Sequence, residues 1–192
     1  MLFGYPLRSF LNTSTLRRTV SRRESIRDLM VWSLHQLDSS FGRYNAGRVI
    51  AGNKVPSYKD VLDREDPLRL TQRVLVNPMM SVLDYDGLIA YDVYEGRAPG
   101  LSLATVSMNS VLSAASSRVL CAMNADDAPR GIATDGFRWA LAVRVGGINR
   151  ICALVDLRPY YIEVLDRDRF RAAEKEDDAV LDDFIRIFLN VR

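Results

Sequence analysis

The chain has 192 residues, of which 48% are hydrophobic and 26% charged, so it carries enough apolar material for a buried core. This composition excludes disorder throughout, and no apolar run reaches the roughly 18 residues that span a bilayer. A formal net charge of +2 gives no argument for a polyanionic partner. Two isolated cysteines and one histidine exclude a disulfide framework and a Cys/His zinc site, so we expect a reducing, intracellular (cytoplasmic) setting.

The N-terminal region is the most basic part of the sequence. Residues 1–30 hold six arginines and two acids, and residues 1–23 hold no acid. We interpret residues 1–56 as a basic arm and helix with a linker, and an organellar transit peptide at 1–23 is the alternative. The arginines could simply face solvent at the start of a helix, or they could contact the phosphates of a nucleic acid. The predicted nucleic-acid contacts are four arginines: Arg17, Arg18, Arg22 and Arg23.

Two helices are expected in the first half of the chain. Residues 22–39 repeat apolar side chains at i, i+3 and i+4 spacing, which predicts one buried helical face. His35, the only histidine, lies beside that face and is expected at the surface. A second helix begins at Asp66-Pro67, an N-cap followed by a first-turn proline, and Pro78 is expected to kink or break it.

From residue 88 onward the sequence alternates between strands and helices. One helix is expected at 110–123 and a last one, with acids in its first turns, at 174–189. Cys121 and Cys152 have apolar neighbours and are expected in the core. The pattern predicts an α/β domain over residues 57–192, with a mixed β-sheet flanked by helices. The expected strands or extended pieces are 88–94, 103–108, 130–134, 137–145, 149–157 and 160–164.

A tight hairpin stands out at residues 131–141, where a buried strand, an Asp135-Gly136 turn and a second strand led by Phe137 and Trp139 follow one another. Several short motifs accompany it in a consistent order over residues 66–190: Val76-Asn-Pro-Met-Met80, Leu83-Asp-Tyr-Asp86, Thr134-Asp-Gly-Phe-Arg-Trp139, Val155-Asp-Leu157 and the cluster from Phe184 to Leu189. Together they resemble the nuclease-like N-terminal domain of restriction subunits from type I restriction-modification enzymes. The resemblance implies a restriction-endonuclease-like PD-(D/E)xK fold preceded by an N-terminal helical arm.

An active domain of that family carries an acid on one strand and Glu-x-Lys on the next, so that the acids bind Mg²⁺ and the lysine activates water. In one alignment Tyr94-Glu-Gly-Arg-Ala-Pro99 takes the place of the Glu-x-Lys segment, with Asp84, Asp86 or Asp92 as the first acid. The candidate catalytic residues are then Glu95, Arg97 and Asp86, although an arginine cannot exchange its proton with water. In the other alignment the strand 103–108 supplies uncharged motif positions: Val106 or Ser107, and Met108 or Asn109.

Both alignments leave the catalytic triad incomplete. The sequence therefore predicts a non-catalytic relative of a restriction-type nuclease domain, acting as a DNA-contacting or assembly module without a metal or cofactor. One alternative is a structural or interaction protein of a virus, a mobile element or a complex that retains the scaffold. Another is a Mg²⁺-dependent DNA endonuclease with a divergent site. The expected partners are DNA and a protein that docks on the helix 174–189.

Overall fold

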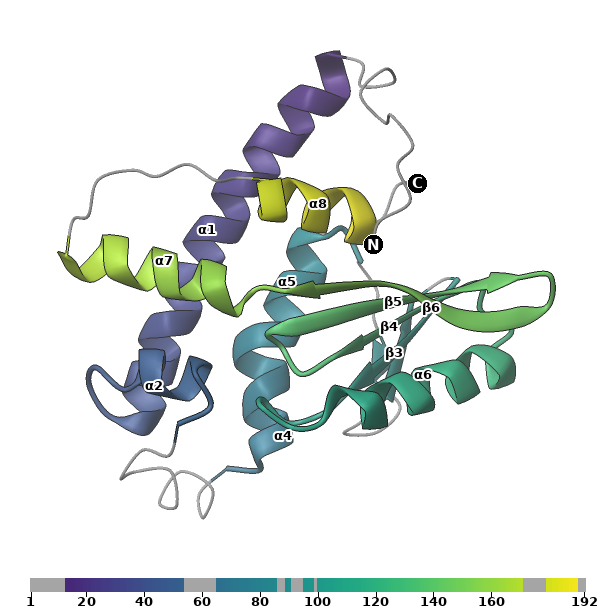
Figure 1. The fold of residues 1–192 in the computed structure, drawn as a ribbon, viewed down its shortest axis with the longest axis horizontal. Coiled ribbons are helices and arrows are strands. Elements are labelled where there is room, and N and C mark those ends of the chain that lie inside the picture. Colours follow the sequence, from purple (N-terminus) through teal and green to yellow (C-terminus); the bar gives the residue numbers. More distant parts are fainter. Residues whose placement is uncertain are drawn as a thin grey trace.

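A computed structural model describes residues 13–53, 65–85, 89–90, 95–98, 100–170 and 179–189 (Figure 1). Side chains are described for 22–53, 65–85, 100–166 and 179–189. The helical elements are α1 (Thr13–Phe41), α2 (Ala46–Ile50), α4 (Pro67–Thr71), a π-helical turn (Gln72–Val76), α5 (Asn77–Val82), α6 (Leu112–Ala125), α7 (Arg158–Phe170) and α8 (Ala179–Phe188). The strands are β1 (Ile89–Ala90), β2 (Glu95–Ala98), β3 (Leu101–Thr105), β4 (Arg130–Thr134), β5 (Arg138–Val145) and β6 (Ile148–Asp156).

The strands form one mixed sheet in sequence order, from β1 at one edge to β6 at the other. Strands β3 and β4 are parallel and are joined by α6, whereas all other neighbours are antiparallel. The expected α/β architecture with a mixed, helix-flanked sheet is therefore confirmed. None of the helices in the described segments is both long and apolar enough to cross a membrane.

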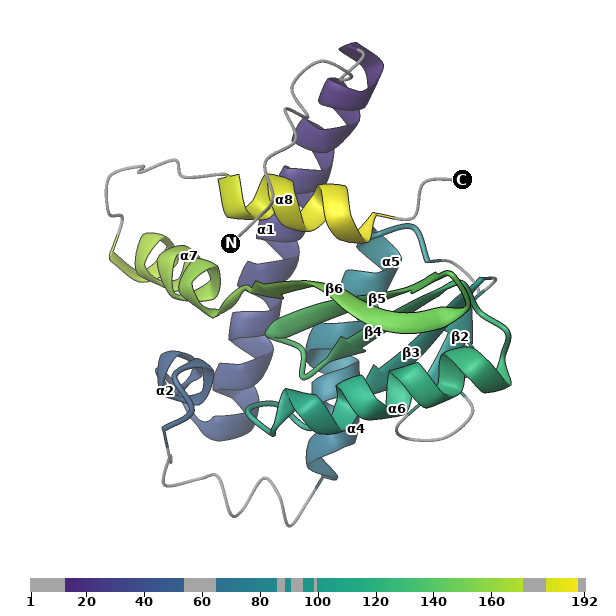
Figure 2. The same ribbon diagram turned by 45° about the vertical axis from the view of Figure 1, so that its right-hand side comes forward.

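Helices cover the two faces of the sheet unequally (Figure 2). Helix α6 lies on one face, while α1, α5, α7 and α8 form a layer on the other. The larger core joins that helical layer to the sheet and includes Ile26 and Met30 of α1 together with Trp139 and Phe184. Because α1 contributes to the same core as the strands, its described side chains pack directly on the α/β region.

The α6 face of the sheet is lined by small residues, which lets the helix approach closely. Ala104, Ala133, Ala140 and Ala142 face Val119 and Met123 of α6 in a second apolar cluster. At Gly131 an added Cβ would lie 2.7 Å from both Val119 and Met123, so glycine is required by this close contact.

The helical segment after residue 65 starts as expected and continues through Pro78. The Asp66 carboxylate accepts the Leu68 backbone N–H at 2.7 Å, and Pro67 occupies the first turn. No break occurs at Pro78. Instead the turn Gln72–Val76 widens to a π-helix immediately before it, and α5 continues with Pro78 in its first turn.

Three other expectations are corrected by the structure. Residues 160–164 belong to helix α7 rather than to an extended piece, because Asp156 accepts the Arg158 N–H and Pro159 follows in the first turn. Cys121 and Cys152 are exposed rather than buried. Cys121 lies between the buried Val119 and Met123, two residues from each, and therefore on the other side of α6.

One expected strand is shifted, and two expected elements are described only in part. The strand expected at 103–108 is β3, which begins at Leu101 and ends at Thr105. Of the strand expected at 88–94, the structure describes Ile89–Ala90 as β1, and the rest lies outside the described residues. Residues 174–178 of the expected last helix also lie outside them.

Candidate functional site

The candidate nuclease residues are distributed over β2 and the segment before β1. Glu95 and Arg97 lie on the same strand, β2, where they are registered with Ala104 and Ser102 of β3. Their side chains, and Asp86 entirely, lie outside the described residues. Strand β3 is fully buried and carries no charged residue. Within the described segments, no group of three His, Cys, Asp or Glu residues could hold a metal ion.

The uncharged motif positions of the second alignment lie beyond the end of β3. There the Met108 N–H donates to the Thr71 hydroxyl at 2.8 Å, and Asn109 donates to the Val49 carbonyl at 2.6 Å. These residues therefore connect the sheet to the helical layer.

Two of the four predicted phosphate-binding arginines make ion pairs within the fold. Arg22 donates to both carboxylate oxygens of Asp84, at 2.5 and 2.6 Å, and to the Val82 carbonyl at the end of α5. Arg23 of α1 lies 2.8 Å from the Asp182 carboxylate of α8. The side chains of Arg17 and Arg18 lie outside the described residues. Arg22 and Arg23 thus hold α1 against α5 and α8.

The β4–β5 hairpin, which carries the Asp135-Gly136 turn, is stabilised by hydrogen bonds to the Asp135 side chain. Asp135 is fully buried, and its Oδ1 accepts the N–H groups of Phe137 and Arg138 while its Oδ2 binds the Arg138 guanidinium. Gly136 has φ +88°, and an added Cβ would lie 2.6 Å from Leu75. Turn geometry and packing therefore account for the aspartate at 135 and the glycine at 136.

The apolar stripe predicted as a docking face on the last helix is covered by the chain itself. Leu181, Phe184, Ile185 and Phe188 of α8 are buried. Phe184 and Phe188 pack edge-on against Trp139, with ring centroids 5.6 and 6.1 Å away. The helix therefore seals one end of the core.

Strand β6, at one edge of the sheet, carries exposed apolar side chains. Strand β6 has nine residues, and no described strand pairs with its outer side. Large aliphatic side chains are exposed along it and at the end of the β5–β6 hairpin, between 39% and 65%: Val145, Ile148, Ile151 and Leu154. A long apolar edge of this kind is a template for pairing with another strand.

A β-bulge lies at the middle of this edge. Leu141 is registered with Ala153 and Ala142 with Ile151, so Cys152 is the extra residue. The Cys152 thiol is 3.4 Å from the Leu141 carbonyl, and partial burial raises its pKa, against smaller opposing effects of a backbone hydrogen bond and Arg130. At the end of β6, burial alone would raise the pKa of Asp156, but hydrogen bonds from Arg158 outweigh it and lower the pKa.

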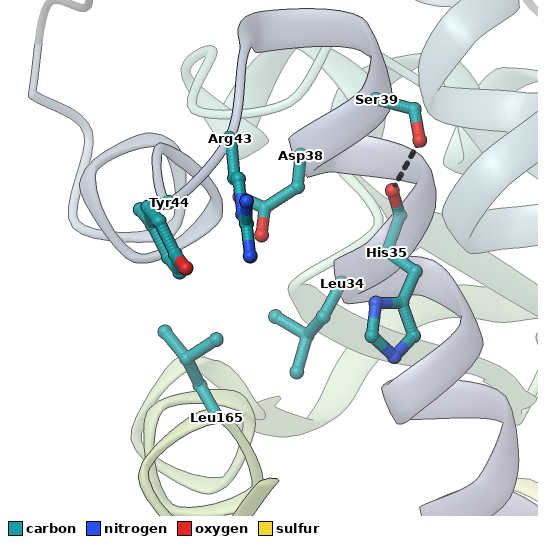
Figure 3. Close-up of a pocket in the computed structure, with 7 residues that line it drawn as sticks. All are labelled: Leu34, His35, Asp38, Ser39, Arg43, Tyr44 and Leu165. Atoms are coloured by element: carbon teal, nitrogen blue, oxygen red, sulfur yellow. Dashed lines mark hydrogen bonds between the residues drawn. The ribbon is translucent and has the colours of Figure 1, made fainter. Parts of the chain in front are cut away.

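A half-open pocket of about 420 Å³ lies between the end of α1, the turn at residues 42–45 and α7 (Figure 3). Its lining residues are Leu34, His35, Asp38, Ser39, Arg43, Tyr44 and Leu165. The Arg43 guanidinium lies over the Tyr44 ring, 4.8 Å from its centroid. His35 is exposed at the rim, which agrees with its expected surface position.

Tyr44 is held in an unfavourable backbone conformation beside this pocket. Its φ of +69° is left-handed, which costs a bulky residue about 1–3 kcal/mol. The turn is fixed by three hydrogen bonds: Asn45 N–H to Gly42, the Asn45 amide to Phe41, and Ala46 N–H to the Asp38 carboxylate.

Neither the β6 edge nor the pocket was predictable from the sequence. Ile148, Ile151 and Leu154 lie in or beside a segment predicted as a strand, but nothing local shows that this strand ends the sheet. The pocket is lined by Arg43 and Tyr44 together with Leu165, which lies far along the chain, so no local pattern predicts it. Comparison with models of protein families, with curated proteins and with solved structures gave no match to any of them.

Proposed function

We propose that this chain is a non-catalytic assembly module, which associates with a second copy of itself through antiparallel pairing of β6. The observation that carries the proposal is the nine-residue strand β6, whose outer side pairs with no strand of the described residues and which bears exposed aliphatic side chains. Natural edges are usually guarded by lysine, proline, an inward charge or a bulge. Strand β6 has the bulge at Cys152, but residues 151–155 carry neither a charge nor a proline.

A second copy fits this edge for two reasons. An antiparallel strand pair related by a twofold axis is self-complementary, so one exposed strand is sufficient for a closed dimer. In that arrangement Arg150, in the first half of β6, approaches the half of the partner strand that ends at Asp156, whereas parallel pairing would align like charges. The formal net charge of +2 opposes association only weakly.

The absence of charged residues from β3 supports a non-catalytic role. A two-acid Mg²⁺ site needs carboxylates from neighbouring strands, and β3 supplies neither an acid nor a lysine beside Glu95 and Arg97 of β2. The order of α5, three antiparallel strands, α6 and a parallel strand is compatible with the proposed kinship to restriction nuclease domains. A DNA-contacting role would fall to Arg17 and Arg18, since Arg22 and Arg23 pair within the fold.

Replacing Ile148 and Leu154 together by lysine is expected to convert a dimer into a monomer of 21.7 kDa. Four added charges, two from each copy, would have to lie at the pairing of the edges, and charged side chains are one way in which natural edges prevent association. Sedimentation velocity over a range of protein concentrations measures the change. Both side chains are exposed, so the fold and its circular dichroism spectrum should stay unchanged.

The control is Val111→Lys, which places one lysine on an exposed apolar residue at the N-cap of α6, away from β6. This variant should sediment like the wild type. A wild-type protein that stays monomeric at about 100 µM, well above the micromolar affinities of weak but specific pairs, would contradict the proposal. So would a double-lysine variant that remains a dimer.

A further inference from the structure

The exposed aliphatic side chains of β6 divide between the two faces of the sheet. Ile151 is registered with Ala142 of β5. Leu154 is registered with Ala140, and both alanines belong to the apolar cluster under α6. Residues directly opposite one another point to the same face of a sheet, so Ile151 and Leu154 lie on the α6 face. Ile148, three regular strand positions before Ile151, lies on the face of the helical layer.

The bulge at Cys152 is the reason that Ile151 and Leu154 share a face. In a regular strand, residues three apart point to opposite faces. Cys152 is the extra residue and has no counterpart on β5, so the alternation restarts after it. Ile151 and Leu154 are thereby consecutive side chains on the α6 face. They are 39% and 65% exposed, so α6 leaves a large part of both uncovered.

We infer that Ile151 of each copy lies opposite Leu154 of the other in the β6 dimer, so that these two residues determine which register the strands adopt. The inference rests on the proposed self-association of β6. A twofold axis perpendicular to the sheet runs the second β6 antiparallel to the first and keeps the α6 faces of both copies on the same side. Residues of the same face are then opposite one another, and the pairing joins four aliphatic side chains into one cluster across the axis.

The two neighbouring registers that keep the faces matched are less favourable. With Cys152 unpaired in both strands, a shift in one direction places Leu154 opposite Asn149 of the second copy, a polar side chain already hydrogen-bonded to α6. A shift in the other direction places Ile151 opposite Asp156 of the second copy, a carboxylate paired within its own chain. Of these three registers, the inferred one alone places an aliphatic side chain opposite an aliphatic one at both positions.

The inferred register also separates the residues that contribute to pairing from those that do not. Ile148 falls beyond the end of the second copy's β6 at Asp156, so it meets no aliphatic side chain of that strand. Specificity follows from the other two positions. An edge strand of another protein with a charged or polar group at either position leaves Ile151 or Leu154 beside that group, which favours a second copy as the partner.

Disulfide mapping tests the register. Both native cysteines are replaced by serine, and Ile151→Cys and Leu154→Cys are made in separate chains of that background. Oxidised glutathione should link an equal mixture of the two chains at least about tenfold faster than either chain alone. Opposite residues have Cβ atoms about 5 Å apart, whereas residues shifted by two positions are about 7–8 Å apart, too far for an S–S bond.

A pair of single lysine variants gives a second measurement. Leu154→Lys should weaken the dimer at least about tenfold, because the charge replaces one member of each aliphatic pair. Ile148→Lys, at a residue of similar exposure on the same strand, should weaken it less than about threefold. Sedimentation velocity gives both dissociation constants. Because both side chains are exposed, circular dichroism should report an unchanged fold.

Two results would overturn the register and leave the dimer in place. The first is Ile151→Cys or Leu154→Cys linking to its own copy as fast as to the other chain. The second is Ile148→Lys weakening the dimer as much as Leu154→Lys. A wild-type chain that stays monomeric at about 100 µM contradicts the proposed function itself, and the register with it.

Discussion

Replacing Trp139 by alanine is expected to lower the free energy of unfolding by about 4 kcal/mol. Trp139 is fully buried at the junction of sheet and helical layer, where it packs edge-on against Phe184 and Phe188 of α8. Its indole N–H also donates to the Gly136 carbonyl at 3.1 Å. Alanine would leave a large cavity beneath α8, which neighbouring rigid rings can fill only in part.

The chain offers a matched control because its other tryptophan, Trp32 of α1, is 41% exposed. Trp32→Ala should cost less than about 1 kcal/mol. Urea unfolding followed by circular dichroism compares the two variants with one probe. Equal losses for both variants would contradict the position of Trp139 in the core.

Replacing Asp135 by alanine is expected to cost about 3 kcal/mol. The fully buried carboxylate accepts the Phe137 and Arg138 N–H groups at 3.1 and 2.7 Å and the Arg138 guanidinium at 2.5 Å. Its loss would leave the Phe137 amide without an acceptor, and Arg138, whose side chain is 24% exposed, without its charge partner. Thermal or urea unfolding measures the difference.

One further variant separates the charge of Asp135 from its hydrogen bonds, and a second serves as a control. Asp135→Asn keeps an oxygen for the backbone N–H groups and should cost about half as much. Asp183→Ala removes an exposed pair with Arg186 at the same i, i+3 spacing and should cost at most about 0.5 kcal/mol. If Asp135→Ala lowered the free energy of unfolding by as little as Asp183→Ala, the Asp135 carboxylate would not stabilise the hairpin.

Elements with strong local patterns could be predicted from the sequence. Ile26, Met30, Leu34 and Leu37 follow one helical stripe, and all four are buried on α1. The β4–β5 hairpin was predictable because Asp135-Gly136 is a turn sequence between two apolar runs.

Helix α7 shows where local pattern failed. Tyr160, Tyr161, Ile162 and Val164 favour strands by propensity, yet the helix is fixed by its start and by packing. Asp156 accepts the N–H two residues further on, as Asp66 does at the start of α4, but Pro159 follows three residues after the acid instead of next to it, so the start is harder to recognise in the sequence. Tyr161 and Leu165 are then buried against the helical layer.

The candidate sites could not be predicted because they arise from tertiary structure. Which strand lies at the edge depends on pairings between segments distant in sequence, so the exposure of Cys152 and Leu154 follows from sheet order rather than from residue type. The expected phosphate role of Arg22 and Arg23 was based on local charge, whereas their partners Asp84 and Asp182 lie far along the chain.

Cross-linking through Cys152 tests the β6 dimer most directly. Cys152 is the middle residue of β6, so antiparallel overlap of the two strands brings it close to its counterpart in the second copy, within reach of a short cross-linker. In Cys121→Ser, which keeps only Cys152, a short bis-maleimide at about pH 8.5 should give a covalent dimer, the pH compensating for the raised thiol pKa. In Cys152→Ser, which keeps the exposed Cys121 of α6, the same treatment should leave monomers, and a dimer seen only with Cys121 would contradict pairing through β6.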